Sequence, residues 1–307
     1  MMNKFFALIL AALMILGAVL PAAADDGFDF RVSSPSGAPG VALASLAVND
    51  PESYTFLAAE TITAEFANNT ADFIIAPLNA GAKLYKAGKS TYKLGAVVTW
   101  GNLFFASQKP GFSLEDINGA EIIMFGENTI NASVALYALQ ENNIVPANVS
   151  YLASAANTQS LLLTDENAIV LTAEPALTAA KIKNENITAY AVNDLYKKAS
   201  GFDGYTQAAL FIRAETIEKD PDGVNAFLAA AAESAEKCTS DLDAAAEAAA
   251  ALEILPNAKV AKLAIPNCAI RFASALDAKE QVEATANIDL SQFGGAVPAD
   301  DFYYGAK

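Results

Sequence analysis

The chain has 307 residues, of which 53% are hydrophobic and 18% charged, and its formal net charge is −16 at pH 7. This length leaves room for two domains with proper cores, and the acidic balance argues against nucleic acid and anionic lipid as partners and favours a soluble monomer. The sequence contains no histidine, which excludes Ser-His-Asp and Cys-His nucleophiles and histidine-based metal sites. An enzyme with this sequence would have to work with carboxylates, Lys, Tyr or a cofactor.

The first 24 residues have the pattern of an export signal. Lys4 gives a positive head, residues 5–20 are apolar, and residues 21–24 supply small side chains for cleavage before Asp25. The alternative is an uncleaved membrane anchor, because the apolar stretch is nearly long enough to span a bilayer. No cysteine in this segment could accept a lipid. We therefore expect a protein in the periplasm or otherwise outside the cytoplasm, not lipid-anchored through cysteine.

Two cysteines, Cys238 and Cys268, lie in the exported part. In an oxidising compartment, two cysteines and no others predict one disulfide. The alternative is a pair of buried free thiols, because the sequence does not show whether the two Cβ atoms meet.

In chain order, the first predicted elements are a strand at residues 28–33, a turn-rich loop at 34–40 and a helix at 41–48. A strand at 54–58 and a helix at 60–68 follow. A Gly- and Ser-rich loop that leads into a helix presents unpaired amides and the positive end of the helix dipole, which suit a carboxylate, sulfonate or phosphate. The candidate ligand contacts in this loop are Ser36, Gly37, Ala38 and Pro39, although a purely structural loop would have the same composition.

Residues 71–107 are expected to organise the site, as strand (73–76), helix (80–87) and strand (94–98). Polar loops follow both strands, and open α/β sheets bind ligands at the carboxyl ends of adjacent strands. The candidates here are Pro77, Asn79, Thr99, Trp100 and Asn102. Asn79 could bind ligand or cap its helix. Trp100 could stack on a flat ligand or pack in a hinge.

The next segment repeats this pattern, with a strand at 120–125, a polar loop at 126–129 and a helix at 130–140. Strands at 150–153 and 168–172 and a helix at 176–182 follow. The candidates are Glu127, Asn128, Thr129, Thr172 and Glu174. Glu127 could accept from an amino group of the ligand or be a solvated loop acid. A strand at 205–212 could carry the chain back, and the Ala-rich helices at 223–238 and 241–255 favour close packing.

Several stretches, in this order, resemble a known family: Gly37-Ala38-Pro39, ADFIIAPLNAGAKLY, TWGNLFFAS, SLEDINGAEII, AEPALTAA and DLSQFGGAVPADDFYY. The family is that of bacterial ABC-transporter substrate-binding proteins of the type II periplasmic-binding fold, in the branch that binds nitrate, sulfonates and thiamine precursors. The resemblance implies an α/β fold of two lobes with two hinge crossings near 99–107 and 204–212. Lobe one would comprise residues 25–107 and 205–307, lobe two residues 108–204, with the ligand in a central cleft.

The resemblance also implies a function. The protein would be a receptor that captures a small organic solute, similar to a pyrimidine, a thiamine precursor or a sulfonate, by hinge closure and delivers it to a membrane permease and its ATPase. It would be no enzyme and need no metal or cofactor. The lack of clustered Arg or Lys argues against nitrate or a dianion. The alternatives are a ligand-binding sensor or surface module, or a pyrimidine-forming enzyme on this fold, whose His- and Cys-rich active region the chain lacks.

Overall fold

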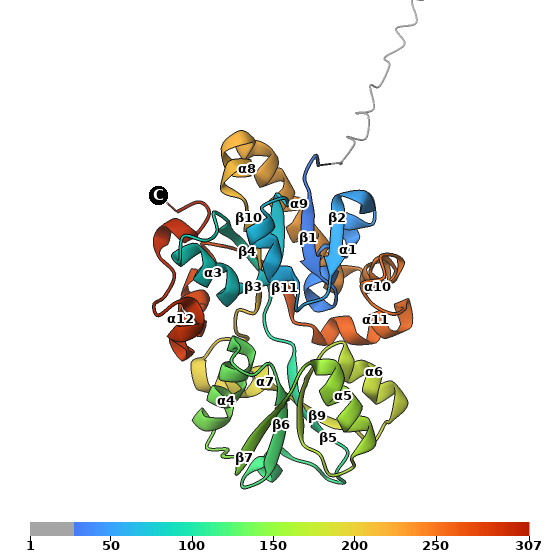
Figure 1. The fold of residues 1–307 in the computed structure, drawn as a ribbon. Coiled ribbons are helices and arrows are strands. Elements are labelled where there is room, and N and C mark those ends of the chain that lie inside the picture. The colour runs from blue at the N-terminus through green and yellow to red at the C-terminus, as the bar shows by residue number, and fades with distance from the viewer. Residues whose placement is uncertain (1–27, 307) are drawn as a thin grey trace, which may run out of the picture.

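The computed structural model describes residues 28–306, so the predicted export signal at residues 1–24 lies outside the described residues. Within this range the chain forms two α/β lobes, one above the other in Figure 1, each built around its own sheet. The predicted two-lobe α/β architecture is confirmed. In this part of the chain no helix combines the length and the apolar character needed to cross a membrane.

The sheet of lobe one has six strands. In spatial order they are β11 (Ile270–Ser274), β4 (Lys93–Thr99), β10 (Ala208–Ile212), β3 (Phe73–Pro77), β1 (Val32–Pro35) and β2 (Tyr54–Leu57). The strands β1, β2 and β3 are parallel, whereas β10 and β11 are antiparallel to the strands they pair with. The central strands are almost fully buried, which explains their continuous apolar sequences.

The prediction that strands β3 and β4 are adjacent is wrong. Strand β10 lies between them and pairs with both, so that Ala209 faces Ala76 on one side and Val97 on the other. The reason is the return of the chain from lobe two, which inserts an all-apolar strand in the middle of the sheet. Because β3 and β4 are both antiparallel to β10, their carboxyl ends still reach the same edge of the sheet.

The sheet of lobe two has five strands. In spatial order they are β7 (Asn148–Leu152), β6 (Glu121–Phe125), β8 (Val170–Ala173), β5 (Leu103–Ser107) and β9 (Thr188–Ala191). Strand β5 pairs with β8 and β9, so it belongs to this lobe. The expected boundary at residue 107 is therefore too late, and the first crossing between the lobes occupies residues 100–102.

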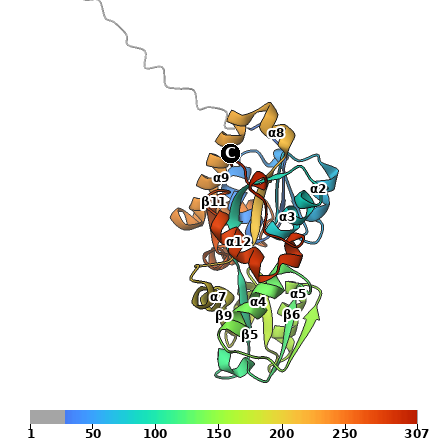
Figure 2. The ribbon, with the colours of Figure 1, turned by 90° about the vertical axis from the view of Figure 1, so that its left-hand side faces the viewer.

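Helices cover both sheets. Those of lobe one are α1 (Ala38–Ala47), α2 (Glu65–Asn68), α3 (Leu78–Lys86), α8 (Ala214–Lys219), α9 (Pro221–Ser240), α10 (Leu242–Ala251), α11 (Ala258–Ala264) and α12 (Lys279–Ile288). Those of lobe two are α4 (Ile130–Glu141), α5 (Ala155–Thr164), α6 (Ala176–Lys183) and α7 (Val192–Ser200). The side view shows α12 directly above α4 (Figure 2). Just after α12, Asp289 accepts a hydrogen bond of 2.8 Å from Ser133 Oγ on α4 and so joins the lobes.

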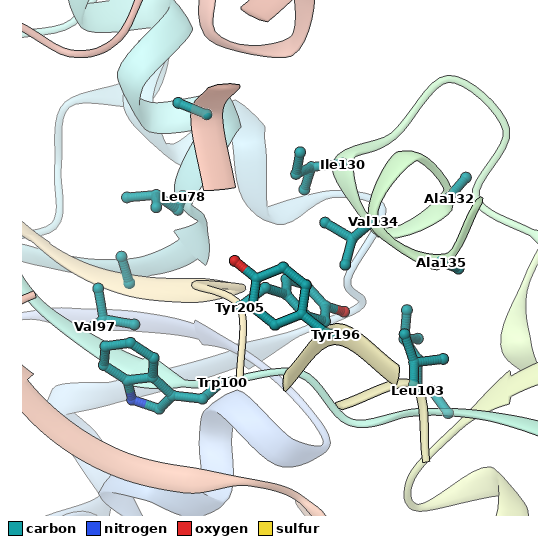
Figure 3. Packing of buried hydrophobic residues seen from close by; sticks show 14 of the residues in the cluster. Leu78, Val97, Trp100, Leu103, Ile130, Ala132, Val134, Ala135, Tyr196 and Tyr205 are labelled. Atoms are coloured by element: carbon teal, nitrogen blue, oxygen red, sulfur yellow. The ribbon is translucent and has the colours of Figure 1, made fainter. Parts of the chain in front are cut away.

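One hydrophobic cluster runs from lobe one through the crossings into lobe two. Figure 3 shows Tyr205 and Tyr196 in the middle of it, between Val97 of lobe one and Val134 of lobe two. Both tyrosines are almost fully buried, and their rings are 6.0 Å apart. The hinge is therefore packed as tightly as a domain core.

The first crossing is held by Asn193 at the start of α7. Its Nδ2 donates to Trp100 O at 2.9 Å and to Gly101 O at 2.8 Å. Gly101 has a φ of +89°, and a Cβ there would lie 2.3 Å from the Tyr205 ring. Only glycine fits this position, because both the backbone conformation and the space exclude a side chain.

The predicted disulfide is wrong in this structure, because Cys238 and Cys268 are both buried free thiols. Cys238 Sγ faces Val41 O at 3.8 Å, and Cys268 Sγ faces Ala264 O at 3.3 Å. Burial raises the pKa of the Cys238 thiol to about 12 and also raises that of Cys268. Each sulfur therefore acts as a small apolar group against its neighbouring helix.

Candidate functional site

A cavity of about 470 Å³ lies between the two lobes. Lobe one contributes the loop after β1 and the start of α3, and lobe two contributes the start of α4 and the segment around Glu174. The predicted site residues that line it are Ser36, Gly37, Ala38, Pro39, Pro77, Asn79, Asn102, Thr129 and Glu174. The strand-end loops of the two lobes thus meet around one cavity, of a size usual for small-molecule sites.

Five helices of the described chain begin at this cavity. The first residues of α1, α4 and α5, the second residue of α3 and the residue before α6 are in its wall: Ala38, Ile130, Ala155, Asn79 and Pro175. The first amides of a helix lack partners within the helix, and the dipole makes this end positive. The positive ends of these helix dipoles therefore lie around the cavity in both lobes. Some of the first amides are already bonded, since Leu78 N donates to Gln207 O at 3.0 Å and Thr178 N donates to Glu174 Oε2 at 3.1 Å.

Local sequence explains why two of these helices begin where they do. Gly37 precedes α1 with a φ of +87°, which glycine adopts without strain, and Pro39 sits in the first turn, where the missing amide hydrogen is no loss. In lobe two, Thr129 caps α4, and its Oγ1 accepts from Ala132 N at 3.4 Å. Thr129 is therefore the N-cap of α4.

A chain of carboxamides closes the hinge side of the cavity. Asn102 Nδ2 donates to Glu174 O at 2.8 Å, and Gln207 Nε2 donates to Asn102 Oδ1 at 2.9 Å. Gln207 Nε2 also approaches Asn131 Oδ1 at 3.3 Å, and Tyr205 Oη donates to the same oxygen at 3.0 Å. These bonds connect both crossings between the lobes to the start of α4.

Neither Gln207 nor Asn131 was predicted as a site residue, although both line the cavity. Asn131 lies two residues past the loop that ends at Thr129, and its position in the first turn of a predicted helix could have nominated it. Gln207 lies in a stretch that reads as an apolar strand, and only the pairing of β10 between β3 and β4 places it beside Asn102.

No Lys or Arg of residues 28–306 is among the cavity-lining residues, and Glu174 is the acid among them. Glu174 is 4% exposed, and its Oε2 accepts from Thr178 N at 3.1 Å while its Oε1 accepts from Thr178 Oγ1 at 2.9 Å. Burial raises the pKa of this carboxyl, and the two bonds from Thr178 oppose that effect. Each oxygen of this carboxylate therefore accepts one bond from Thr178 and keeps a further lone pair.

The raised pKa of Glu174 predicts a pH-dependent effect of Glu174→Gln. The folded state binds this proton more tightly than the unfolded state, so the stability of the wild type falls as the pH rises from about 4.3 through the folded pKa. Glutamine fits the same bonds, since its oxygen can accept from Thr178 N and its NH2 can donate to Thr178 Oγ1. We expect the variant to gain stability over the wild type with rising pH. Thermal unfolding at pH 4 to 8 measures this, and a constant difference would contradict it.

The other predicted site residues are not in the cavity wall. Trp100 is 3% exposed, its Nε1 donates to Arg271 O at 2.8 Å, and the Arg271 guanidinium lies 4.1 Å from the ring centre. Thr99 Oγ1 accepts from Ala208 N at 3.0 Å within the sheet. Thr172 is buried in β8. Glu127 and Asn128 are exposed on the loop before α4. In this structure Trp100 therefore packs in the hinge, which was one of its two predicted roles.

No protein-family model matches the sequence, and no curated protein matches it either. Solved structures do match. A protein described as an ABC transporter from Parabacteroides distasonis is 20% identical with a TM-score of 0.76, over 92% of this chain and 100% of that chain. The periplasmic aliphatic sulphonate binding protein SsuA of Escherichia coli is 16% identical with a TM-score of 0.65, over 85% of this chain and 86% of that chain.

The alkanesulfonate-binding protein SsuA of Xanthomonas axonopodis pv. citri, solved with bound MOPS, is 14% identical with a TM-score of 0.62 over 88% of this chain and 94% of that chain. At these identities the likeness establishes the fold. The chain therefore has the two-lobe fold of the type II periplasmic binding proteins of ABC transporters, and the resemblance seen in the sequence is confirmed at that level.

Proposed function

We propose that the protein is an extracytoplasmic receptor of an ABC importer, which encloses a small organic anion between its lobes by hinge closure and delivers it to a membrane permease and its ATPase. The observation that carries this proposal is the cavity between the lobes, at which five helices of the described chain begin. Such helix ends stabilise an anion without a basic side chain.

The chemistry of the wall favours a singly charged oxyanion, such as a sulfonate or a carboxylate. Helix ends and the NH2 of Asn131 favour a negatively charged group, and each carboxyl oxygen of Glu174 already accepts one bond from Thr178. Two of the similar structures are described as sulfonate-binding proteins, one of them bound to MOPS, which agrees with this proposal. A flat pyrimidine is less favoured, because Trp100 does not line the cavity and cannot stack on it.

We further propose that the solute is bound without being altered, and that the predicted residues in the wall, from Ser36 to Glu174, contact it. The sequence has no histidine to act as a base for a hydroxyl or thiol nucleophile, which supports binding over catalysis. Recovery of an unchanged solute by mass spectrometry, after incubation with the protein, would agree with this, and a converted product would contradict it.

The test is a thermal-shift screen of the chain from Asp25 against ethanesulfonate, isethionate, taurine, acetate and cytosine. A ligand at 100 times its Kd stabilises the folded state by about 2.7 kcal/mol, so a binding anion raises the melting temperature measurably. We expect ethanesulfonate or isethionate to stabilise the protein more than taurine or cytosine. If none of these anions has an effect, the proposal fails.

A matched pair of variants locates the site. Ala155 begins α5 and lines the cavity, whereas Ala156, next to it in the first turn, is exposed. A glutamate is compatible with the first turn of a helix at either position. We expect Ala155→Glu to abolish anion binding, because its carboxylate would take up the donors of the cavity. The control Ala156→Glu, with the same added charge, should retain binding, and equal losses in both variants would place the site elsewhere.

A further inference from the structure

The carboxamide chain at the hinge side of the cavity has a fixed direction. It starts at Glu174 O, a main-chain carbonyl, which can only accept a hydrogen bond. The group that Asn102 turns toward it, at 2.8 Å, must therefore be its NH2. The other end of the Asn102 amide, Oδ1, consequently faces Gln207 and requires a donor there.

The orientation of the Asn102 carboxamide fixes that of the Gln207 carboxamide in turn. To satisfy Asn102 Oδ1 at 2.9 Å, Gln207 must present its Nε2, and its Oε1 then faces Thr99 Oγ1, which donates at 3.4 Å. The same Nε2 lies 3.3 Å from Asn131. Because a donor faces Asn131 from this side, the atom of Asn131 turned toward it must be its oxygen.

The chain ends with a free donor at the cavity. Asn131 Oδ1 accepts from both Gln207 Nε2 and Tyr205 Oη, so its Nδ2 points the other way. Within residues 28–306 this Nδ2 donates to no protein group, and it is not among the buried side-chain atoms that lack a partner, so it is accessible. Asn131 is in the cavity wall, and its NH2 is therefore available to a ligand.

We propose that Gln207 is a positioning residue that sets the polarity of the cavity, by holding the carboxamide of Asn131 with its NH2 toward the ligand. This inference rests on the proposed function and adds a determinant of specificity to it. With Asn131 held in this way the side chain donates to an anion. Turned by 180°, the same side chain would offer its oxygen and favour a ligand with an ammonium or other donor group.

The variant Gln207→Glu tests the orientation directly, without any ligand. At pH 8 the new carboxylate can only accept, so Asn131 must turn its NH2 toward residue 207. The resonance of the Asn131 NH2 is identified by its loss in Asn131→Asp in a nitrogen–proton correlation spectrum. We expect one of its two protons to shift downfield and its exchange with water to slow in Gln207→Glu. An Asn131 NH2 resonance unchanged in both respects overturns the proposal.

The binding test uses ethanesulfonate and taurine, which carry the same sulfonate and differ in the ammonium group. Losing a hydrogen bond to a charged ligand costs about 1.5–3 kcal/mol, so we expect the affinity for ethanesulfonate to fall by about 10- to 100-fold in Gln207→Glu. The ratio of taurine to ethanesulfonate affinity should rise by a similar factor. Titration calorimetry measures both.

Gln292→Glu is the matched control for the added charge. Gln292 Oε1 accepts from Asn79 Nδ2 at 3.5 Å at the cavity wall, so a carboxylate there keeps the existing bond and reorients nothing. This variant should lower the affinity for ethanesulfonate and for taurine by the same factor. The ratio of the two affinities should stay unchanged. If Gln292→Glu changes the ratio as much as Gln207→Glu does, charge alone explains the effect and the proposal is overturned.

Gln207→Met covers the case in which the buried carboxylate prevents folding. Methionine removes the donor to Asn131 without adding charge, so the NH2 resonance should broaden or double as two orientations become populated. A single Asn131 NH2 resonance at its wild-type position would overturn the proposal. Both spectroscopic results stand even if no sulfonate binds to the wild type, in which case the proposed function fails and the orientation is still decided.

Discussion

Replacing Gly101 with alanine is expected to lower the free energy of unfolding by about 2–5 kcal/mol. A Cβ at this position would lie 2.3 Å from the Tyr205 ring and 2.6 Å from Asn193 Oδ1. Tyr205 cannot move aside easily, because it is fully buried and its hydroxyl is bound to Asn131. The positive φ adds about 1–2 kcal/mol of backbone strain to an overpacking cost of about 1–3 kcal/mol. Urea denaturation monitored by circular dichroism measures the loss.

The control for this prediction is Gly111→Ala. Gly111 also has a positive φ, of +72°, but a Cβ there would meet no atom within 4 Å. The Gly111→Ala variant therefore measures the cost of the backbone strain alone. We expect it to lower the free energy of unfolding by about 1–2 kcal/mol. If Gly101→Ala costs no more than Gly111→Ala, the hinge is less tightly packed than described above.

Replacing Phe227 with alanine should lower the free energy of unfolding by an amount similar to that for Gly101→Ala, because this side chain lies at the centre of an aromatic cluster in lobe one. Its ring stacks on Phe73 at 4.0 Å between centroids and meets the rings of Phe28 at 5.3 Å and Phe30 at 6.0 Å nearly edge-on. Phe227 has no exposed surface. A buried Phe→Ala change costs about 3–5 kcal/mol through lost burial and the cavity left behind. Chemical denaturation again gives the value.

Phe227→Leu serves as the comparison for this truncation. Leucine keeps most of the buried apolar volume of Phe227 and loses the ring contacts, so its cost should be well below that of alanine. A loss under about 1 kcal/mol for Phe227→Ala would mean that the surrounding rings collapse into the space, contrary to the close packing of the cluster.

The sequence was a good guide to the local elements of the site. The pattern of strand, polar loop and helix start nominated Ser36 to Pro39, Asn79 and Thr129, and these residues do line one cavity. The reason is physical: caps, glycines and prolines that begin a helix act over a few residues and are visible in the sequence. The same local rules explain why Ser113 and Asp116 form a capping box.

Long-range pairing could not be predicted in this way. The position of β10 between β3 and β4 brings Gln207 to Asn102, and no local signal in the sequence carries that information. The prediction of a disulfide was wrong for a similar reason, since the relative placement of the two cysteines is a long-range property. In the fold, Cys238 and Cys268 each face a helix carbonyl. Trp100 was nominated for its chemistry, but its position next to Arg271 depends on β11, which was not predicted.

The late insertion of β10 also has a consequence for how the molecule assembles. The middle of the first sheet is supplied by residues 208–212, which follow all of the second lobe in the chain. A nascent chain that has reached residue 200 holds every strand of the second sheet but lacks the strand that joins β3 to β4. The second lobe can therefore complete its sheet during synthesis, whereas in the first lobe β3 lacks a partner on one edge and β4 on both edges until β10 and β11 are made.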